Sequence, residues 1–161
     1  MTLPQASGRQ PVSSTSSLYN DVIMDHIKNA RNYRELAGAN RQAEGINPLC
    51  GDTFTIYVQI EDDRVRDLSF QCSCCGISMA SASVMTTLLQ GRSVQDARAQ
   101  GREFMRLLRD PQAGQDSPRD QGQAAVLAVV RESPSRVNCA VLAWHTLDAA
   151  LDGRESATLG G

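Results

Sequence analysis

Four residues of this chain, Cys50, Asp52, Cys75 and Cys139, are of types that bind transition metals. Cys50 and Asp52 lie two positions apart, so an extended backbone would place their thiolate and carboxylate on the same side of the chain. We expect Cys75 where a strand passes into a helix, and Cys139 at the start of the last helix. Three thiolates and one carboxylate form a four-coordinate donor set that suits zinc. The carboxylate is the hard donor, and we expect it to be the more exchangeable ligand.

The spacing of these residues is weak support for a metal site. They are far apart in the sequence and include no C-x-x-C pair. The interpretation of Cys50 and Asp52 as turn residues without a metal therefore stays open. The chain has five cysteines in all, and this odd number argues against a disulfide framework in a protein that is not secreted.

Length and composition restrict the classes of protein that the chain can belong to. Its 161 residues predict a single domain over 17–152, with a disordered N-terminal tail over 1–16 and a flexible C-terminal tail over 153–161. The formal net charge is -2 and no basic stripe is present, so we expect no nucleic-acid partner. The longest apolar stretch, 124–130, is too short to span a membrane. The N-terminus has no apolar run of the secretory kind, and we expect a cytoplasmic protein.

The hydrophobic pattern predicts an α+β fold, in which a small antiparallel sheet packs against helices and the metal site lies at one end. Alternating apolar residues over 52–72, with a polar turn at 61–64, predict a β-hairpin. Residues 31–47 and 111–119 are predicted to be loops. Helices are expected from a cap at Ser17 to residue 30, over 76–91 and 93–108, over 121–131, and over 137–151.

Three motifs in the sequence resemble those of the U-type iron–sulfur assembly family, which includes the scaffold proteins of the Isc and Nif systems and SufU. They are Asn47-Pro48-Leu49-Cys50-Gly51-Asp52, the run from Cys75-Gly76-Ile77 to Ser83, and Arg136-Val137-Asn138-Cys139. The similarity covers about residues 18 to 152. The long segment between Cys75 and Cys139 resembles the SufU branch of the family.

The resemblance implies a function for each residue of the set. Cys50, Asp52, Cys75 and Cys139 match the metal ligands of the family, which hold zinc in SufU-like proteins. Cys50 also matches the residue that accepts sulfur from a PLP-dependent cysteine desulfurase of the SufS type and passes it towards iron–sulfur scaffold or apo-acceptor proteins. Arg136 matches a basic position, which we assign to docking or to steadying thiolate charge.

The resemblance leaves more than one function open. As a sulfur acceptor, the protein would be a sulfurtransferase that activates a desulfurase rather than a stand-alone enzyme. The alternative from a different class is a scaffold on which a [2Fe–2S] or [4Fe–4S] cluster is assembled on the same ligands and then transferred. A zinc-stabilised interaction module without chemistry is the third.

Two further cysteines depart from the family pattern. Cys74 stands where the family usually has glycine, and Cys72 is also unusual. The pair could replace other metal ligands, form a disulfide or do neither. Cys72 shares the strand face of Phe70 and is expected to be a core residue. His26 is expected to be an exposed surface residue or a loop contact.

Overall fold

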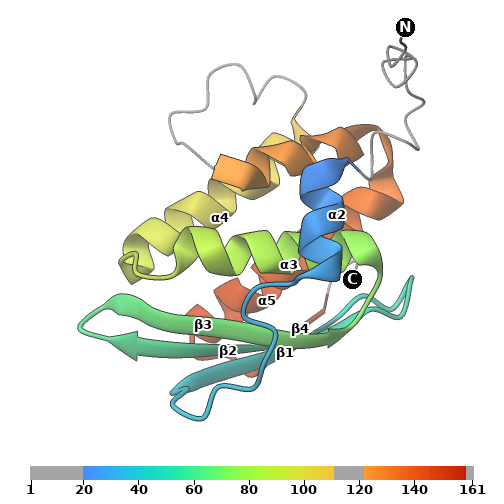
Figure 1. Ribbon diagram of the computed structural model, residues 1–161. Coiled ribbons are helices and arrows are strands. Elements are labelled where there is room, and N and C mark those ends of the chain that lie inside the picture. Colours follow the sequence, from blue (N-terminus) through green and yellow to red (C-terminus); the bar gives the residue numbers. More distant parts are fainter. Residues whose placement is uncertain (1–19, 111–121, 159–161) are drawn as a thin grey trace, which may run out of the picture.

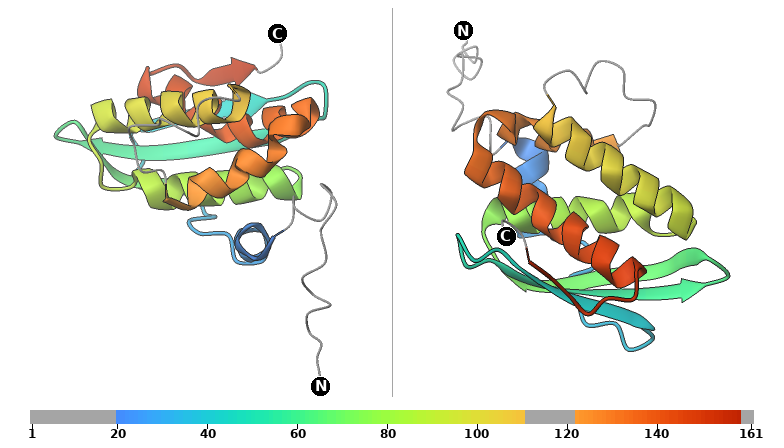
Figure 2. Two further views of the ribbon diagram at one scale, coloured as in Figure 1. Left: turned by 90° about the horizontal axis from the view of Figure 1, so that it is seen from above. Right: turned by 180° about the vertical axis from the view of Figure 1, so that it is seen from behind.

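The structure is a computed structural model that describes residues 20–110 and 122–158 (Figure 1). A four-stranded sheet forms one layer, in the order β3-β2-β1-β4. The strands are β1 (Arg41–Ile46), β2 (Thr53–Glu61), β3 (Arg64–Ser73) and β4 (Ser156–Thr158). Figures 1 and 2 show the helices gathered over one face of this sheet. The predicted α+β class is confirmed.

Strands β2 and β3 form the predicted antiparallel hairpin. The side chains that point toward the helices are buried: Phe54, Ile56, Val58, Leu68 and Phe70. Asp62 and Asp63 connect the strands and have φ values of 54° and 60°. Positive φ at both central residues is typical of the two-residue turn whose twist matches a hairpin.

Strand β1 corrects the prediction that residues 31–47 are a loop. It pairs antiparallel with β2 and parallel with β4. The inward-facing residues of β1 are small because a helix lies directly against them: a Cβ added to Gly45 would lie 1.8 Å from Thr146 Oγ1. Strand β4 lies within the segment expected to be a C-terminal tail, and it adds a parallel pair to the sheet. The domain boundaries stay a prediction.

The described helices are α2 (Asp21–Lys28), α3 (Gly76–Leu89), α4 (Val94–Arg109), the 3-10 helix η3 (Gly122–Glu132) and α5 (Pro134–Leu151). Ser93 is the N-cap of α4, because its side chain accepts a hydrogen bond from the Asp96 amide. The predicted cap Ser17, the tail over 1–16 and the loop over 111–119 lie outside the described residues. Across 20–110 and 122–158, every helix is too short or too polar to cross a bilayer.

Helices α3 and α5 are joined by buried serines. The Ser78 hydroxyl lies 3.0 Å from the carbonyl oxygen of Cys139 and shares its one proton between this oxygen and Asp52, and the Ser81 hydroxyl donates to the carbonyl of Ala140. Trp144 Nε1–H donates to Ser81 Oγ at 3.0 Å. These bonds fix the first turns of α5 against the start of α3 and so determine where Cys139 lies.

The structure corrects the expectation for His26, which is buried at 1% exposure. Its Nε2 lies 2.6 Å from Gln123 Oε1 and its Nδ1 lies 2.6 Å from Ser83 Oγ. Because the amide oxygen only accepts, Nε2 carries the proton and Nδ1 accepts from the Ser83 hydroxyl. His26 therefore links α2, α3 and η3.

Candidate metal centre

Cys50 and Asp52 lie on a tight loop between β1 and β2. The buried Asn47 organises this loop: its carbonyl accepts from the amides of Cys50 and Gly51, and its side chain accepts from the Leu49 amide at 3.0 Å. Gly51 has a φ of 81°, a conformation that residues with a Cβ rarely adopt. The Asn-Pro-x-Cys-Gly-Asp motif is therefore a loop that turns the Cys50 thiol and the Asp52 carboxylate towards α5.

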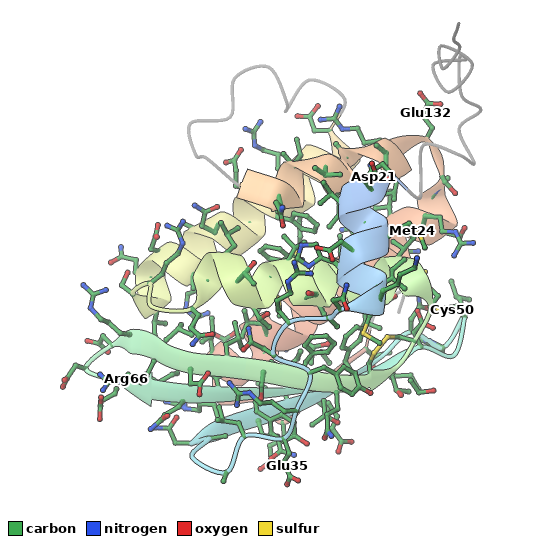
Figure 3. The ribbon with its side chains drawn as sticks, viewed as in Figure 1. Asp21, Met24, Glu35, Cys50, Arg66 and Glu132 are labelled. Carbon is green, nitrogen blue, oxygen red and sulfur yellow. A yellow bond between two sulfur atoms is a disulfide. The ribbon has the colours of Figure 1, made fainter. Side chains whose placement is uncertain are left out.

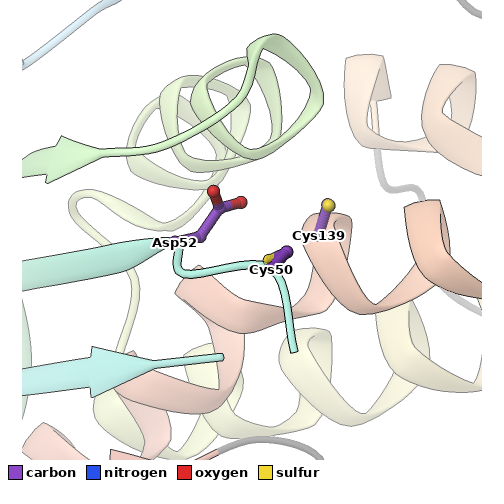
Figure 4. Close-up of side chains that lie close together, drawn as sticks. All are labelled: Cys50, Asp52 and Cys139. Atoms are coloured by element: carbon purple, nitrogen blue, oxygen red, sulfur yellow. The ribbon is translucent and has the colours of Figure 1, made fainter. Parts of the chain in front are cut away.

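Three of the four predicted ligands converge in the structure. One ligand atom each from Cys50, Asp52 and Cys139 lie within 4.8 Å of one another (Figure 4). Sulfur and oxygen ligand atoms of a tetrahedral zinc site are about 3.6–3.8 Å apart, given zinc–sulfur and zinc–oxygen bonds of about 2.3 and 2.1 Å. Small side-chain rotations would bring the three atoms to these distances, so the donor set fits the ion.

Cys75 lies at the edge of this group rather than within it. It is the N-cap residue of α3, and its Sγ is hydrogen-bonded to Cys139 and lies 3.5 Å from Ser78 Oγ. The position of a thiol at the positive end of a helix favours the thiolate form. Cys75 is thus beside the three converging residues, and its assignment as the fourth ligand stays a prediction.

Asp52 is 7% exposed, and its Oδ2 accepts a 2.7 Å hydrogen bond from the Ser78 hydroxyl. No arginine or lysine within 20–110 and 122–158 forms an ion pair with it. A buried carboxylate without a cationic side chain is a site where a metal ion offsets the cost of desolvation. Sequence reasoning missed the function of Ser78; the available signal was a hydroxyl side chain three positions after Cys75, about one helical turn away.

Hydrogen bonding makes the Cys75 and Cys139 thiols different. The hydrogen bond with Cys139 lowers the pKa of Cys75 to about 5, and hydrogen bonds from Ser78 act in the same direction, while burial and the Asp52 charge oppose them. The same hydrogen bond, together with burial, raises the pKa of Cys139. Near neutral pH the metal-free protein therefore holds a Cys75 thiolate that accepts from the Cys139 thiol. Metal binding to both sulfurs would release the Cys139 proton.

We expect iodoacetamide to alkylate Cys75 in the metal-free protein from mildly acidic pH upward. The thiolate is the reactive form, so the rate at Cys75 should rise around pH 5 and then level off, whereas an ordinary thiol titrates near pH ~8.5. Mass spectrometry of peptides at a series of pH values measures this profile. In a Cys139→Ala variant the profile should shift to higher pH, because the main hydrogen-bond donor is gone. A wild-type midpoint near pH ~8.5 would contradict the assignment.

The three free cysteines differ in their exposure to solvent. Cys50 is exposed, Cys75 is half-buried and Cys139 is buried.

Arg136 is half-buried in the first turn of α5, one turn before Cys139, and its predicted function stays a prediction. The prediction that Cys72 is only a core residue is wrong, because Cys72 forms a disulfide with Cys74.

Comparisons with known proteins agree with the motifs. The model of the NifU-like N-terminal domain matches residues 18–140. The chain is 33% identical over 142 residues to an iron–sulfur cluster assembly scaffold protein IscU of Streptococcus pyogenes, covering 87% of this chain and 86% of the relative. It is 32% identical over 143 residues to the zinc-dependent sulfurtransferase SufU of Bacillus subtilis, covering 89% and 95%.

A solved structure shares the fold. The crystal structure of a putative iron–sulfur cluster assembly scaffold protein for the SUF system from Fervidobacterium islandicum superposes with a TM-score of 0.75 at 30% identity. The match covers 83% of this chain and 96% of that one. The chain therefore belongs to the NifU-like N-terminal domain family, the U-type family of iron–sulfur cluster assembly proteins.

Proposed function

We propose that the protein is a zinc-dependent sulfur acceptor that takes persulfide sulfur from a cysteine desulfurase of the SufS type. The observation that carries this proposal is the exposed Cys50 thiol lying in one group with Asp52 and Cys139. A partner's persulfide can reach an exposed sulfur, whereas Cys139 is buried. The relative from Bacillus subtilis, named a zinc-dependent sulfurtransferase, supports the same function.

The proposed ligands are Cys50, Asp52, Cys75 and Cys139. Zinc bound there would hold the sulfurs as thiolates at neutral pH. Asp52 would be the hard donor of the set, and because its carboxylate also accepts from Ser78, it would keep a hydrogen-bond partner if it were not bound to the ion.

The transfer step uses Cys50 as nucleophile. Its thiolate attacks the outer sulfur of a persulfide on the partner, a new sulfur–sulfur bond forms at Cys50, and the bond to the partner's cysteine breaks. The partner leaves with a thiolate, and Cys50 holds the persulfide. The loop set by Asn47 and Gly51 presents this sulfur at the surface of the protein.

A cluster scaffold is the second candidate. The relative from Streptococcus pyogenes is named a scaffold protein, and the same thiols could hold an iron–sulfur cluster as cargo. The long segment between Cys75 and Cys139 resembles SufU and favours the sulfur acceptor. The downstream recipient and the cytoplasmic location stay predictions.

Desulfurase turnover tests the proposal. The zinc-loaded protein should stimulate cysteine desulfurisation by a SufS-type enzyme, and the protein stripped of metal should not. Protein purified without oxygen should contain about one zinc per chain and show no visible absorbance. A coloured preparation that transfers its cluster to an apo-acceptor would instead support the scaffold function. Equal stimulation with and without zinc would contradict the zinc dependence.

A further inference from the structure

The Cys72–Cys74 disulfide is a feature that the proposed sulfur transfer does not use. Cys72 is the second-last residue of β3, and Cys74 follows it two positions later. Both residues are half-buried against the core. The Tyr33 hydroxyl donates to the Cys72 carbonyl at 2.9 Å and accepts from its amide at 3.3 Å, which holds the backbone of Cys72 in place. In Figure 3 the disulfide lies at the same end of the sheet as Cys50.

The register of the β2–β3 hairpin places Cys74 next to the metal centre. Thr53 pairs with Ser73 at the end of the hairpin, and Asp52 and Cys74 are the next residues along the chain on either side of this pair. Asp52 in turn has a carboxylate oxygen within 4.8 Å of Cys50 Sγ. Cys74 is therefore the nearer cysteine of the disulfide to Cys50.

The side chains also share a face of the sheet. Asp52 lies two residues before the buried Phe54, and Cys72 and Cys74 lie two and four residues after the buried Phe70. Side chains two positions apart on a strand point to the same side. The Phe54 and Phe70 rings have centroids 5.9 Å apart, so the two strands turn the same face to the helices. The cysteine pair and the metal centre thus lie on one side of the sheet.

We propose that Cys72 and Cys74, when reduced, convert the persulfide sulfur on Cys50 into sulfide. The Cys74 thiolate attacks the outer sulfur of the Cys50 persulfide, which moves that sulfur to Cys74 and restores the Cys50 thiolate. The Cys72 thiolate then attacks Cys74 Sγ, forms the Cys72–Cys74 disulfide and releases hydrogen sulfide. This proposal rests on the proposed function, because it needs a persulfide on Cys50.

The proposed reaction balances without a further reactant. One Cys50 persulfide and two thiols give one Cys50 thiol, one disulfide and one hydrogen sulfide. The two electrons that reduce the sulfur come from the two thiols. The structure holds the oxidised product of this reaction. A dithiol reductant returns the pair to thiols by exchange, and both cysteines are half-buried rather than fully buried.

Single-turnover sulfide release tests the proposal. The zinc-loaded protein is reduced, freed of reductant and given one equivalent of glutathione persulfide as sulfur donor. The wild type should release about one equivalent of sulfide per chain and lose the mass of two hydrogens as the disulfide forms. Cys74→Ser should keep the persulfide on Cys50, and Cys72→Ser should hold it on Cys74. Peptide mass spectrometry locates the sulfur in each case.

The outcomes separate this proposal from the proposed function. If Cys74→Ser carries a persulfide on Cys50 but releases sulfide as fast as the wild type, the cysteine pair is not the reductant and the proposal is overturned. The same holds if the reduced wild type keeps its persulfide. If the Cys72→Ser, Cys74→Ser double variant takes up no sulfur on Cys50, the acceptor function itself fails.

Discussion

A Cys50→Ser variant is expected to accept no sulfur from a SufS-type desulfurase and to stimulate its turnover no more than buffer does. The serine hydroxyl is neither ionised at neutral pH nor able to form a persulfide, so the nucleophile is lost. Cys50 is the exposed thiol among the three that are free, and neither Cys75 nor Cys139 is as accessible to a partner. The measurement is desulfurase turnover, together with mass spectrometry of the acceptor after a single turnover.

The matched control removes two other cysteines. The Cys72→Ser, Cys74→Ser double variant keeps Cys50, Asp52 and Cys139 and should still acquire a persulfide on Cys50. Zinc content and thermal unfolding of each variant show whether the fold is intact. If Cys50→Ser still stimulates the desulfurase fully, with the sulfur on another cysteine, the assignment of the acceptor is wrong.

A Gly45→Ala variant is expected to lower the free energy of unfolding by about 1–3 kcal/mol, which is the usual cost of overpacking a core. The added Cβ would lie 1.8 Å from Thr146 Oγ1 and 3.0 Å from Thr146 Cβ, so α5 must move away from β1. Because α5 carries Cys139, zinc affinity should fall along with stability. Urea denaturation and zinc titration measure the two effects.

Two further variants isolate the cause of this loss. Gly101→Ala makes the same substitution in α4, where the new Cβ would meet the Trp144 ring at an ordinary 3.8 Å, and it should not destabilise the protein. Adding Thr146→Ala to Gly45→Ala should recover most of the stability, because the shortest contact is then absent. A Gly45→Ala variant as stable as the wild type would show that β1 and α5 are less closely packed than described.

The parts of the fold that were predicted are those that local pattern determines. Alternating apolar residues specify the β2–β3 hairpin. The extended backbone expected at Cys50 and Asp52 is wrong, because the two residues lie in a loop in which Gly51 has a φ of 81°. Strand β1 was missed because its inward residues are Ala43 and Gly45, whose small size gives no apolar alternation. Gly45 has no room for a side chain because Thr146 on α5, a residue that is distant in the sequence, lies directly against it.

The other residues whose environment the sequence did not predict also have partners that are distant in the sequence. His26 is buried because Ser83 and Gln123, which lie 57 and 97 residues away, satisfy both ring nitrogens. Ser78 matters to the site through Asp52 and the carbonyl of Cys139, and only the packed α3–α5 pair brings these groups together. Contacts of this kind depend on tertiary structure, which periodicity does not encode.

The parallel pairing of β4 with β1 has a consequence for synthesis of the protein on the ribosome. Strand β1 leads directly into the loop that carries Cys50 and Asp52, and β4 covers its outer edge at residues 44–46. Translation proceeds from the N-terminus, so this edge stays open until residues 156–158 have emerged. Cys139 also emerges late. The nascent chain thus presents an unpaired strand edge and separated thiols for most of its synthesis, and the proposed metal site would be completed only after Cys139 and β4 have emerged.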